Sequence, residues 1–190
     1  MKYPGIIFKC IVGAALLMSA SVLGHAQRFS VGTDAIEWLE LGTMNLEASV
    51  AVAQNLTLHA GAGINPWTFA KGNAEKQLEN RVITYWGGAR WWPWYVYSGW
   101  WAGVNVRYML YNRGGIFNRQ TEEAEAIGGG LMGGYSIMLS DHWNLDLGVG
   151  FWSGSKKYTV YECPVCGVVM DEGRKMFFVP DARVVISLIF

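Results

Sequence analysis

The sequence has few charges, and it lacks an apolar run long enough for a transmembrane helix. Charged residues make up 16% of the chain, against about 25% in an average soluble domain. The longest uncharged stretch after the N-terminal region covers residues 91–106, and Pro93 and Gly99 interrupt it. A helical span needs roughly 20 apolar residues, so membrane-spanning helices are not expected. The composition, 52% hydrophobic and rich in glycine and aromatics, fits strands and interfaces better than helices.

Net charge is also lacking, because 15 basic residues balance 15 acidic ones. Proteins that bind nucleic acid, or that dock on anionic lipid through a polybasic patch, carry a clear positive excess. We therefore expect no nucleic-acid partner.

Histidine is scarce, which limits acid–base chemistry. Beyond the N-terminal region the chain has His59 and His142, and Ser30 and Ser49 are the hydroxyl groups expected near His59. A catalytic base must lie within hydrogen-bond reach of the group that it activates, and scattered histidines are more often structural or solvated. We expect no enzymatic activity, no catalytic residue and no cofactor.

The first 26 residues have the pattern of a secretory signal peptide. Lys2 and Lys9 give a basic start, "IVGAALLMSASVLG" is a short apolar core, and residues 24–26 resemble a small-residue cleavage site. We expect residues 1–26 to be cleaved after export by the general secretory route, which leaves residues 27–190 as one domain.

Cys163 and Cys166 lie in the motif "CPVCG". A tetrahedral zinc or iron site takes four ligands, and neither a second cysteine pair nor a nearby histidine supplies the other two. In an exported protein, two thiols this close favour a disulfide or an exposed thiol pair. A metal site shared between molecules is the alternative.

Apolar residues alternate with polar or small ones along much of the chain. In "NLEASVAVA", one face carries Leu46, Ala48, Val50 and Val52, and the other carries Asn45, Glu47 and Ser49. This period of two is typical of strands. Strands are expected near residues 28–40, 44–53, 56–66, 80–92, 97–111, 124–139, 143–161 and 177–190. The pattern predicts an all-β fold, a single up-and-down antiparallel transmembrane β-barrel of about eight strands.

The connections between the expected strands alternate in length. Residues 54–55, 93–96 and 140–143 are short turns that share one side, whereas the loops on the other side are mostly long and carry most of the charges. The long ones are residues 67–79, 112–123 and 162–176, and residues 41–43 are a brief one. Short turns on one side and long loops on the other are typical of outer-membrane barrels.

Aromatic residues gather at the strand ends beside the short turns. An outer-membrane barrel carries an aromatic girdle at each membrane interface. The girdle expected at the inner interface consists of Trp91, Trp92, Trp94, Trp100, Trp101, Trp143 and Phe190.

The chain ends in "DARVVISLIF", which places Ala182, Val184, Ile186, Leu188 and Phe190 on one face of the last strand. A closed barrel has no free edge, so this apolar face would meet lipid. A terminal aromatic after alternating apolar residues resembles the signal that bacterial outer-membrane barrels present to their insertion machinery. We expect outer-membrane lipid and that machinery as partners.

Five charged residues fall on the faces opposite the apolar rows. An unpaired buried charge is costly, so we expect them to pair across the lumen. An eight-stranded barrel has an interior just wide enough for side chains, which favours a structural plug over the alternative of a narrow solute channel. The expected lumen network consists of Glu47, Arg90, Arg107, Asp146 and Arg183.

Several motifs are similar to the Bacteroides-type family known as domain of unknown function 3575. They are "NPWTF", "YNRGGIF", "GGGLMGGYSIMLSDHWNLDLGVGFW", "YECPVCG" and "VPDARVVISLIF", which together span nearly the whole chain after residue 26. The resemblance implies an outer-membrane or surface-associated β-barrel, often encoded near fimbria-like adhesins, with no established activity. It assigns no catalytic residue.

We therefore expect a non-enzymatic outer-membrane β-barrel with a structural, adhesive or surface-assembly role. The expected partner, a surface or fimbrial protein, would contact the long loops. A narrow solute channel and a lipid-modifying outer-membrane enzyme are the alternatives.

Overall fold

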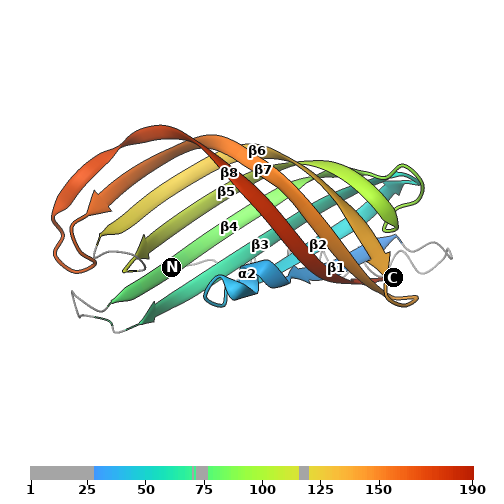
Figure 1. Ribbon diagram of the computed structural model, residues 1–190, viewed down its shortest axis with the longest axis horizontal. Coiled ribbons are helices and arrows are strands. Elements are labelled where there is room, and N and C mark those ends of the chain that lie inside the picture. The colour runs from blue at the N-terminus through green and yellow to red at the C-terminus, as the bar shows by residue number, and fades with distance from the viewer. Residues whose placement is uncertain (1–27, 70, 72–76, 116–119) are drawn as a thin grey trace, which may run out of the picture.

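A computed structural model describes residues 28–69, 71, 77–115 and 120–190. The expected signal peptide, residues 1–26, lies outside these described residues. Eight antiparallel strands follow one another in sequence order around a closed barrel (Figure 1). This confirms the predicted all-β, up-and-down architecture. No helix among the described residues is long and apolar enough to cross a membrane.

The strands lengthen steadily along the chain, from 6 residues in β1 to 21 in β8. A short helix, α2 (Ala35–Leu39), separates the first two strands. The strands are β1 (Phe29–Asp34), β2 (Met44–Ala53), β3 (Leu56–Phe69), β4 (Leu78–Trp91), β5 (Gly99–Gly114), β6 (Thr121–Met138), β7 (Trp143–Tyr161) and β8 (Val169–Ile189).

The first strand is shorter than the sequence predicted, because residues 35–39 form α2 instead of continuing it. Asp34 caps this helix: its side chain accepts a hydrogen bond from the Ile36 N–H. The same carboxylate binds Arg183 of β8, which fixes the point where the chain leaves the wall. Because Asp34 makes both contacts, the chain turns into a helix after residue 34 instead of continuing to pair as a strand.

Strands β2 and β7 have the predicted bounds, whereas β3, β4, β5, β6 and β8 run further into the regions expected as loops. β5 continues to Gly114, β6 begins at Thr121, and β8 begins at Val169 rather than near residue 177. Several charged residues of these regions lie on paired strands: Arg113 is opposite Asn80, Glu123 is opposite Thr159, and Lys175 is opposite Lys156.

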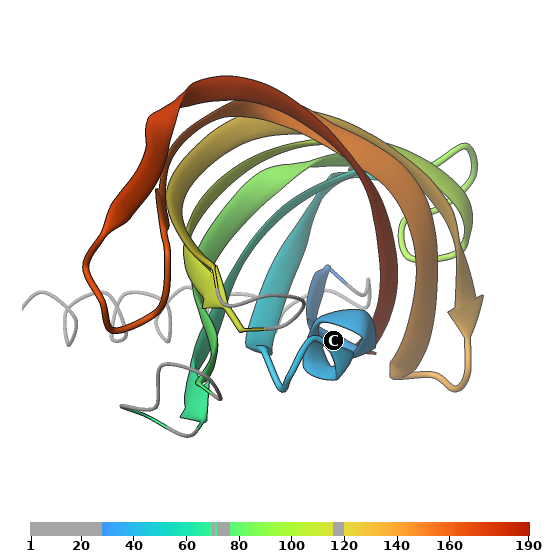
Figure 2. The same cartoon turned by 60° about the vertical axis from the view of Figure 1, so that its left-hand side comes forward.

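Because the strands differ in length, they form a complete ring at one end of the barrel and an interrupted one at the other. β1 closes it by pairing with β2 and, through Asp34 opposite Val185, with β8. The pairing of β2 with β3 ends where Met44 is opposite Ile64. Beyond these points β3–β8 alone form a curved wall, with α2 in the gap between β2 and β8 (Figure 2). We call this part the outer sheet, its end the loop end, and the opposite end the turn end.

Alternation sorts the side chains of the wall. Polar residues such as Asn45, Ser49 and Asn144 are buried inside, and large apolar residues such as Leu46 and Val149 are exposed outside. Glycine makes room where a bulky inward side chain crosses a strand. A Cβ atom on Gly61 would lie 2.4 Å from the Trp86 ring, so only glycine fits beneath it.

Candidate functional site

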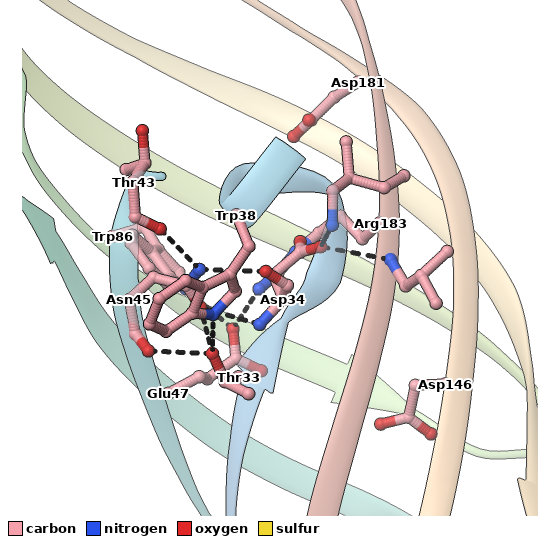
Figure 3. A network of polar contacts seen from close by, with 12 residues as sticks. Thr33, Asp34, Trp38, Thr43, Asn45, Glu47, Trp86, Asp146, Asp181 and Arg183 are labelled. Carbon is pink, nitrogen blue, oxygen red and sulfur yellow. Dashed lines mark hydrogen bonds and ion pairs between the residues drawn. The ribbon is translucent and has the colours of Figure 1, made fainter. Parts of the chain in front are cut away.

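Ion pairs inside the lumen link strands that are not neighbours in the wall, and Figure 3 shows the part of this network around Asp34, Glu47 and Arg183. Arg183 donates from Nε to Asp34 Oδ2 at 3.0 Å, and its Nη2 lies 2.7 Å from Glu47 Oε2. Arg90 Nη2 binds Glu47 Oε1 at 2.5 Å, and Arg90 Nη1 lies 3.9 Å from Asp146 Oδ2. The five residues come from β1, β2, β4, β7 and β8, so the network ties distant strands together.

Hydrogen bonds satisfy the remaining oxygens of these carboxylates. Trp86 Nε1 donates to Glu47 Oε2 at 2.7 Å, and the Val184 N–H donates to Asp34 Oδ1 at 3.2 Å. Ser136 and Asn144 both donate to Asp146 Oδ1. Because buried charges are tolerated only when they are paired and hydrogen-bonded, this network holds the barrel in one arrangement.

Arg107, the fifth member of the expected network, lies elsewhere. It binds Asp181 at 3.0 Å and stacks on the rings of Trp86 and Trp152, 5.9 and 5.4 Å from their centres. Sequence reasoning missed Asp34 and Asp181 as partners. Alternation could have identified both. Asp181 shares its face of β8 with Arg183, and Asp34 shares its face of β1 with Ser30.

An aromatic cluster fills the lumen toward the turn end. It consists of Trp92, Tyr97, Trp101, Met132 and Ile189, all buried. Trp92 and Trp101 lie 6.3 Å apart between ring centres, and the Arg90 guanidinium stacks over Trp101 at 4.9 Å. The expected outward position of Trp92 and Trp101 in the girdle is therefore wrong. Neighbouring residues of a strand face opposite sides, so a pair of adjacent tryptophans places one inside.

The remaining girdle residues do face outward. Trp91, Trp94, Trp100, Trp143 and Phe190 are all exposed and lie at or beside the turn end. The backbone N–H of Phe190 donates to Phe29 at 2.9 Å, so the last residue of the chain continues the pairing of β8 with β1.

The serines expected near His59 bind each other instead. Ser30 and Ser49 share a 2.7 Å hydrogen bond, and Ser49 also binds the Tyr97 hydroxyl at 3.0 Å. His59 is buried opposite Ser49, and its Nδ1 has no hydrogen-bond partner within the described residues. His142 lies in the exposed β6–β7 turn. The arrangement provides no nucleophile held against a base.

A cavity of about 410 Å³ opens between α2 and the inner face of the wall. We call it the cup. Its floor includes Ile36 and Glu37, and its wall includes Trp152 and Phe177, whose rings meet edge to face at 4.4 Å. Around it, Arg113 binds Glu40 at 3.4 Å, and Lys156 binds Glu122 and Tyr111. The cup combines aromatic surface with paired charges.

Glu37 is the exception among the charged residues of the cup. Its Oε2 is buried without a hydrogen-bond partner in the described part of the chain. Burial raises the pKa of Glu37 from 4.5 to about 7, although nearby Arg107 opposes the shift. Because the folded protein holds this proton more tightly than the unfolded chain, Glu37 lowers stability as the pH rises from 4.5 to about 7.

Replacing Glu37 by Gln is therefore expected to stabilise the protein by about 1–3 kcal/mol at pH 8 and to change little at pH 4. The heat-induced change in gel mobility of the detergent-solubilised barrel measures this. Glu162→Gln, in the β7–β8 loop, is the control. An equal effect of Glu37→Gln at both pH values would contradict the assigned protonation.

The structure joins Cys163 and Cys166 in a disulfide within the β7–β8 loop. Among residues 28–69, 71, 77–115 and 120–190, no group of three or more histidine, cysteine or carboxylate side chains could hold a metal ion.

The described residues thus form a filled lumen below an open cup and an outer sheet. No curated protein matches the chain. A family model does, over residues 12–190, which is nearly the full length. The chain belongs to the family described as "Protein of unknown function (DUF3575)".

Proposed function

We propose that this protein is an exported outer-membrane β-barrel, closed to solutes, that presents its outer sheet to a partner at the cell surface. The observation that carries the proposal is the sorting of side chains. Among the described residues, the buried side chains are mostly polar or charged, and large apolar side chains cover the outside. A water-soluble barrel hides its apolar faces, whereas a barrel in lipid exposes them.

The outward surface is divided into levels that fit a membrane. At the turn end lie the exposed aromatics Trp91, Trp94, Trp100, Trp143 and Phe190. Apolar residues follow along the strands, as in Leu58, Val104, Leu131, Val149 and Ile186. Outward charges appear in the outer sheet, where they are Arg81, Glu123, Glu125, Lys157, Glu172 and Arg174. An apolar band between an aromatic girdle and a charged rim matches a barrel that crosses one bilayer.

The side chains that fill the lumen support the proposal that it is closed to solutes. The ion network from Arg90 to Arg183 and the aromatic cluster around Trp92 occupy successive levels of the interior. An eight-stranded barrel has little further space at those levels. The features open to a partner are then the cup and the outer sheet.

Peptide tags test the orientation. A tag inserted after Lys71, at the loop end, is expected to bind antibody on intact cells. A tag inserted after Asp141, in the β6–β7 turn, is expected to bind antibody only after the outer membrane is permeabilised. Binding of both tags on intact cells, or recovery of the protein in the soluble periplasmic fraction, would contradict the proposal.

Planar bilayers test closure with the purified protein. We expect no discrete conductance steps. Steps of constant size that disappear in a matched blank preparation would instead support the narrow solute channel.

A further inference from the structure

The outer sheet leaves β8 with an open edge. β1 pairs with β8 only from Val185 to Ile189, and the Val184 N–H is taken up by Asp34. From Val169 to Arg183, β7 on the other side is the strand that pairs with β8 in the described part of the chain. Residues 169–176 are exposed on both faces, as expected for an edge.

The direction of the backbone groups along this edge can be read from its closed part. The N–H groups of Val184 and Phe190 point toward β1, so the even-numbered residues of β8 direct their backbone away from β7. Residues 172, 174, 176 and 178 therefore direct their N–H and C=O groups to the open edge; the run stops at the register shift between Val169 and Asp171. Pro180 has no N–H and ends this run on the side of α2. Such a row is a template for another strand.

The side chains on the free edge are ordered so that they complement themselves. Asp171 and Glu172 precede Gly173, and Arg174 and Lys175 follow it. We propose that the β8 edge binds the β8 edge of a second copy of this chain, antiparallel and centred on Gly173. Glu172 of each copy is then opposite Arg174 of the other, and Asp171 is opposite Lys175. This rests on the proposed function and names the partner of the outer sheet.

Alternative registers lose this match. Moving the centre by one residue, to Glu172 or Arg174, places that charge opposite itself. Registers centred between residues would oppose even with odd positions and break the hydrogen-bond pattern. A parallel, in-register pair aligns every like charge, which is destabilising in cross-strand pairs. Edge charges normally block pairing, but this order attracts an antiparallel copy instead.

The pairing has a consequence for the orientation of the two barrels. A two-fold axis through Gly173 makes the interface isologous and points the barrel axes in opposite directions. Two copies can then meet from facing membranes, or freely in detergent. The inferred partner is therefore a copy on an opposing membrane surface, which is an adhesive contact.

Charge-reversed variants test the pairing in detergent by sedimentation. The wild type is expected to form a dimer that weakens as salt is added. Asp171→Lys with Glu172→Arg, and separately Arg174→Glu with Lys175→Asp, give edges of a single sign that are expected to stay monomeric. An equimolar mixture of the two variants is expected to restore the dimer. A monomeric wild type, dimers of either variant alone, or a mixture that stays monomeric would each overturn the inference.

Cross-linking tests the register. A Cβ atom on Gly173 would lie 3.5 Å from the Tyr158 hydroxyl, an ordinary contact, so cysteine fits there. Opposed Gly173 residues form a non-hydrogen-bonded pair with Cα atoms about 4.5 Å apart, within disulfide range. In a Cys163→Ser, Cys166→Ser background, Gly173→Cys should give a covalent dimer on oxidation, and Met176→Cys should not. Equal yields from both, or none from Gly173→Cys, would overturn the register.

The two proposals fail separately. Loss of pairing in detergent overturns the β8 contact and leaves the membrane placement intact. Exposure of the Asp141 tag on intact cells overturns the placement and leaves pairing in detergent intact.

Discussion

Replacing Arg183 by Met is expected to lower the free energy of unfolding by about 3–5 kcal/mol, because it leaves buried carboxylates without their partner. Arg183 binds Asp34 and Glu47 together, and its side chain is 3% exposed, so water cannot replace the lost contacts. Glu47 would keep Arg90, whereas Asp34 would keep no ion pair in the described structure. Asp34 also caps α2, so the helix and the start of the outer sheet should loosen first. The heat-induced change in gel mobility measures the loss.

Arg81→Met is the matched control, because Arg81 lies on strand β4 of the same wall but its side chain is 62% exposed. Its effect should be within about 0.5 kcal/mol. A second variant, Arg183→Met combined with Asp34→Asn, removes the charge that the first leaves behind. It should recover part of the loss. An unchanged transition for Arg183→Met would mean that water already screens the network.

The sequence predicted which residues enter the lumen better than it predicted their partners. Alternation alone places Glu47, Arg90, Asp146 and Arg183 inside, where the structure brings them together. It could not tell that Arg107 binds Asp181, because that contact depends on the stagger of β5 against β8 across the lumen. Stagger is a property of the closed barrel rather than of any one strand.

The helix α2 was missed although a local signal was present. Asp34 and Glu37 have the spacing of a capping box, an N-cap residue followed three positions later by glutamate. Ile36 and Trp38 are two residues apart, a spacing that also suits a strand, although they are out of phase with Phe29 and Val31 of β1; this period of two concealed the helix. The parts of the outer sheet within residues 67–79, 112–123 and 162–176 have the composition of loops, because charges are tolerated on strands that extend beyond lipid.

Replacing Trp101 by Ala is expected to cost about 3–5 kcal/mol, as for other buried tryptophans. Trp101 is 5% exposed and packs against Trp92, the Arg90 guanidinium and the surface left by Gly134 and Gly148. A Cβ atom on Gly134 would lie 2.6 Å from its ring, so the ring packs directly on that backbone; Gly134 is paired with strands on both sides, which keeps the backbone from moving into the space. The Ala variant should therefore keep a cavity, and loss of the Arg90 contact should weaken the ion network beside it.

Trp100 is the matched control, since it is the neighbouring residue on β5 but is 59% exposed. Its main aromatic contact is with Tyr135, at 5.1 Å between ring centres. Trp100→Ala should then cost about 1 kcal/mol, the scale of one aromatic pair. Trp101→Phe tests packing separately from hydrogen bonding: Trp101 Nε1 has no partner among the described residues, so Phe should retain most of the stability. Equal losses for Trp100→Ala and Trp101→Ala would contradict the inward position of Trp101, and with it the aromatic closure of the lumen.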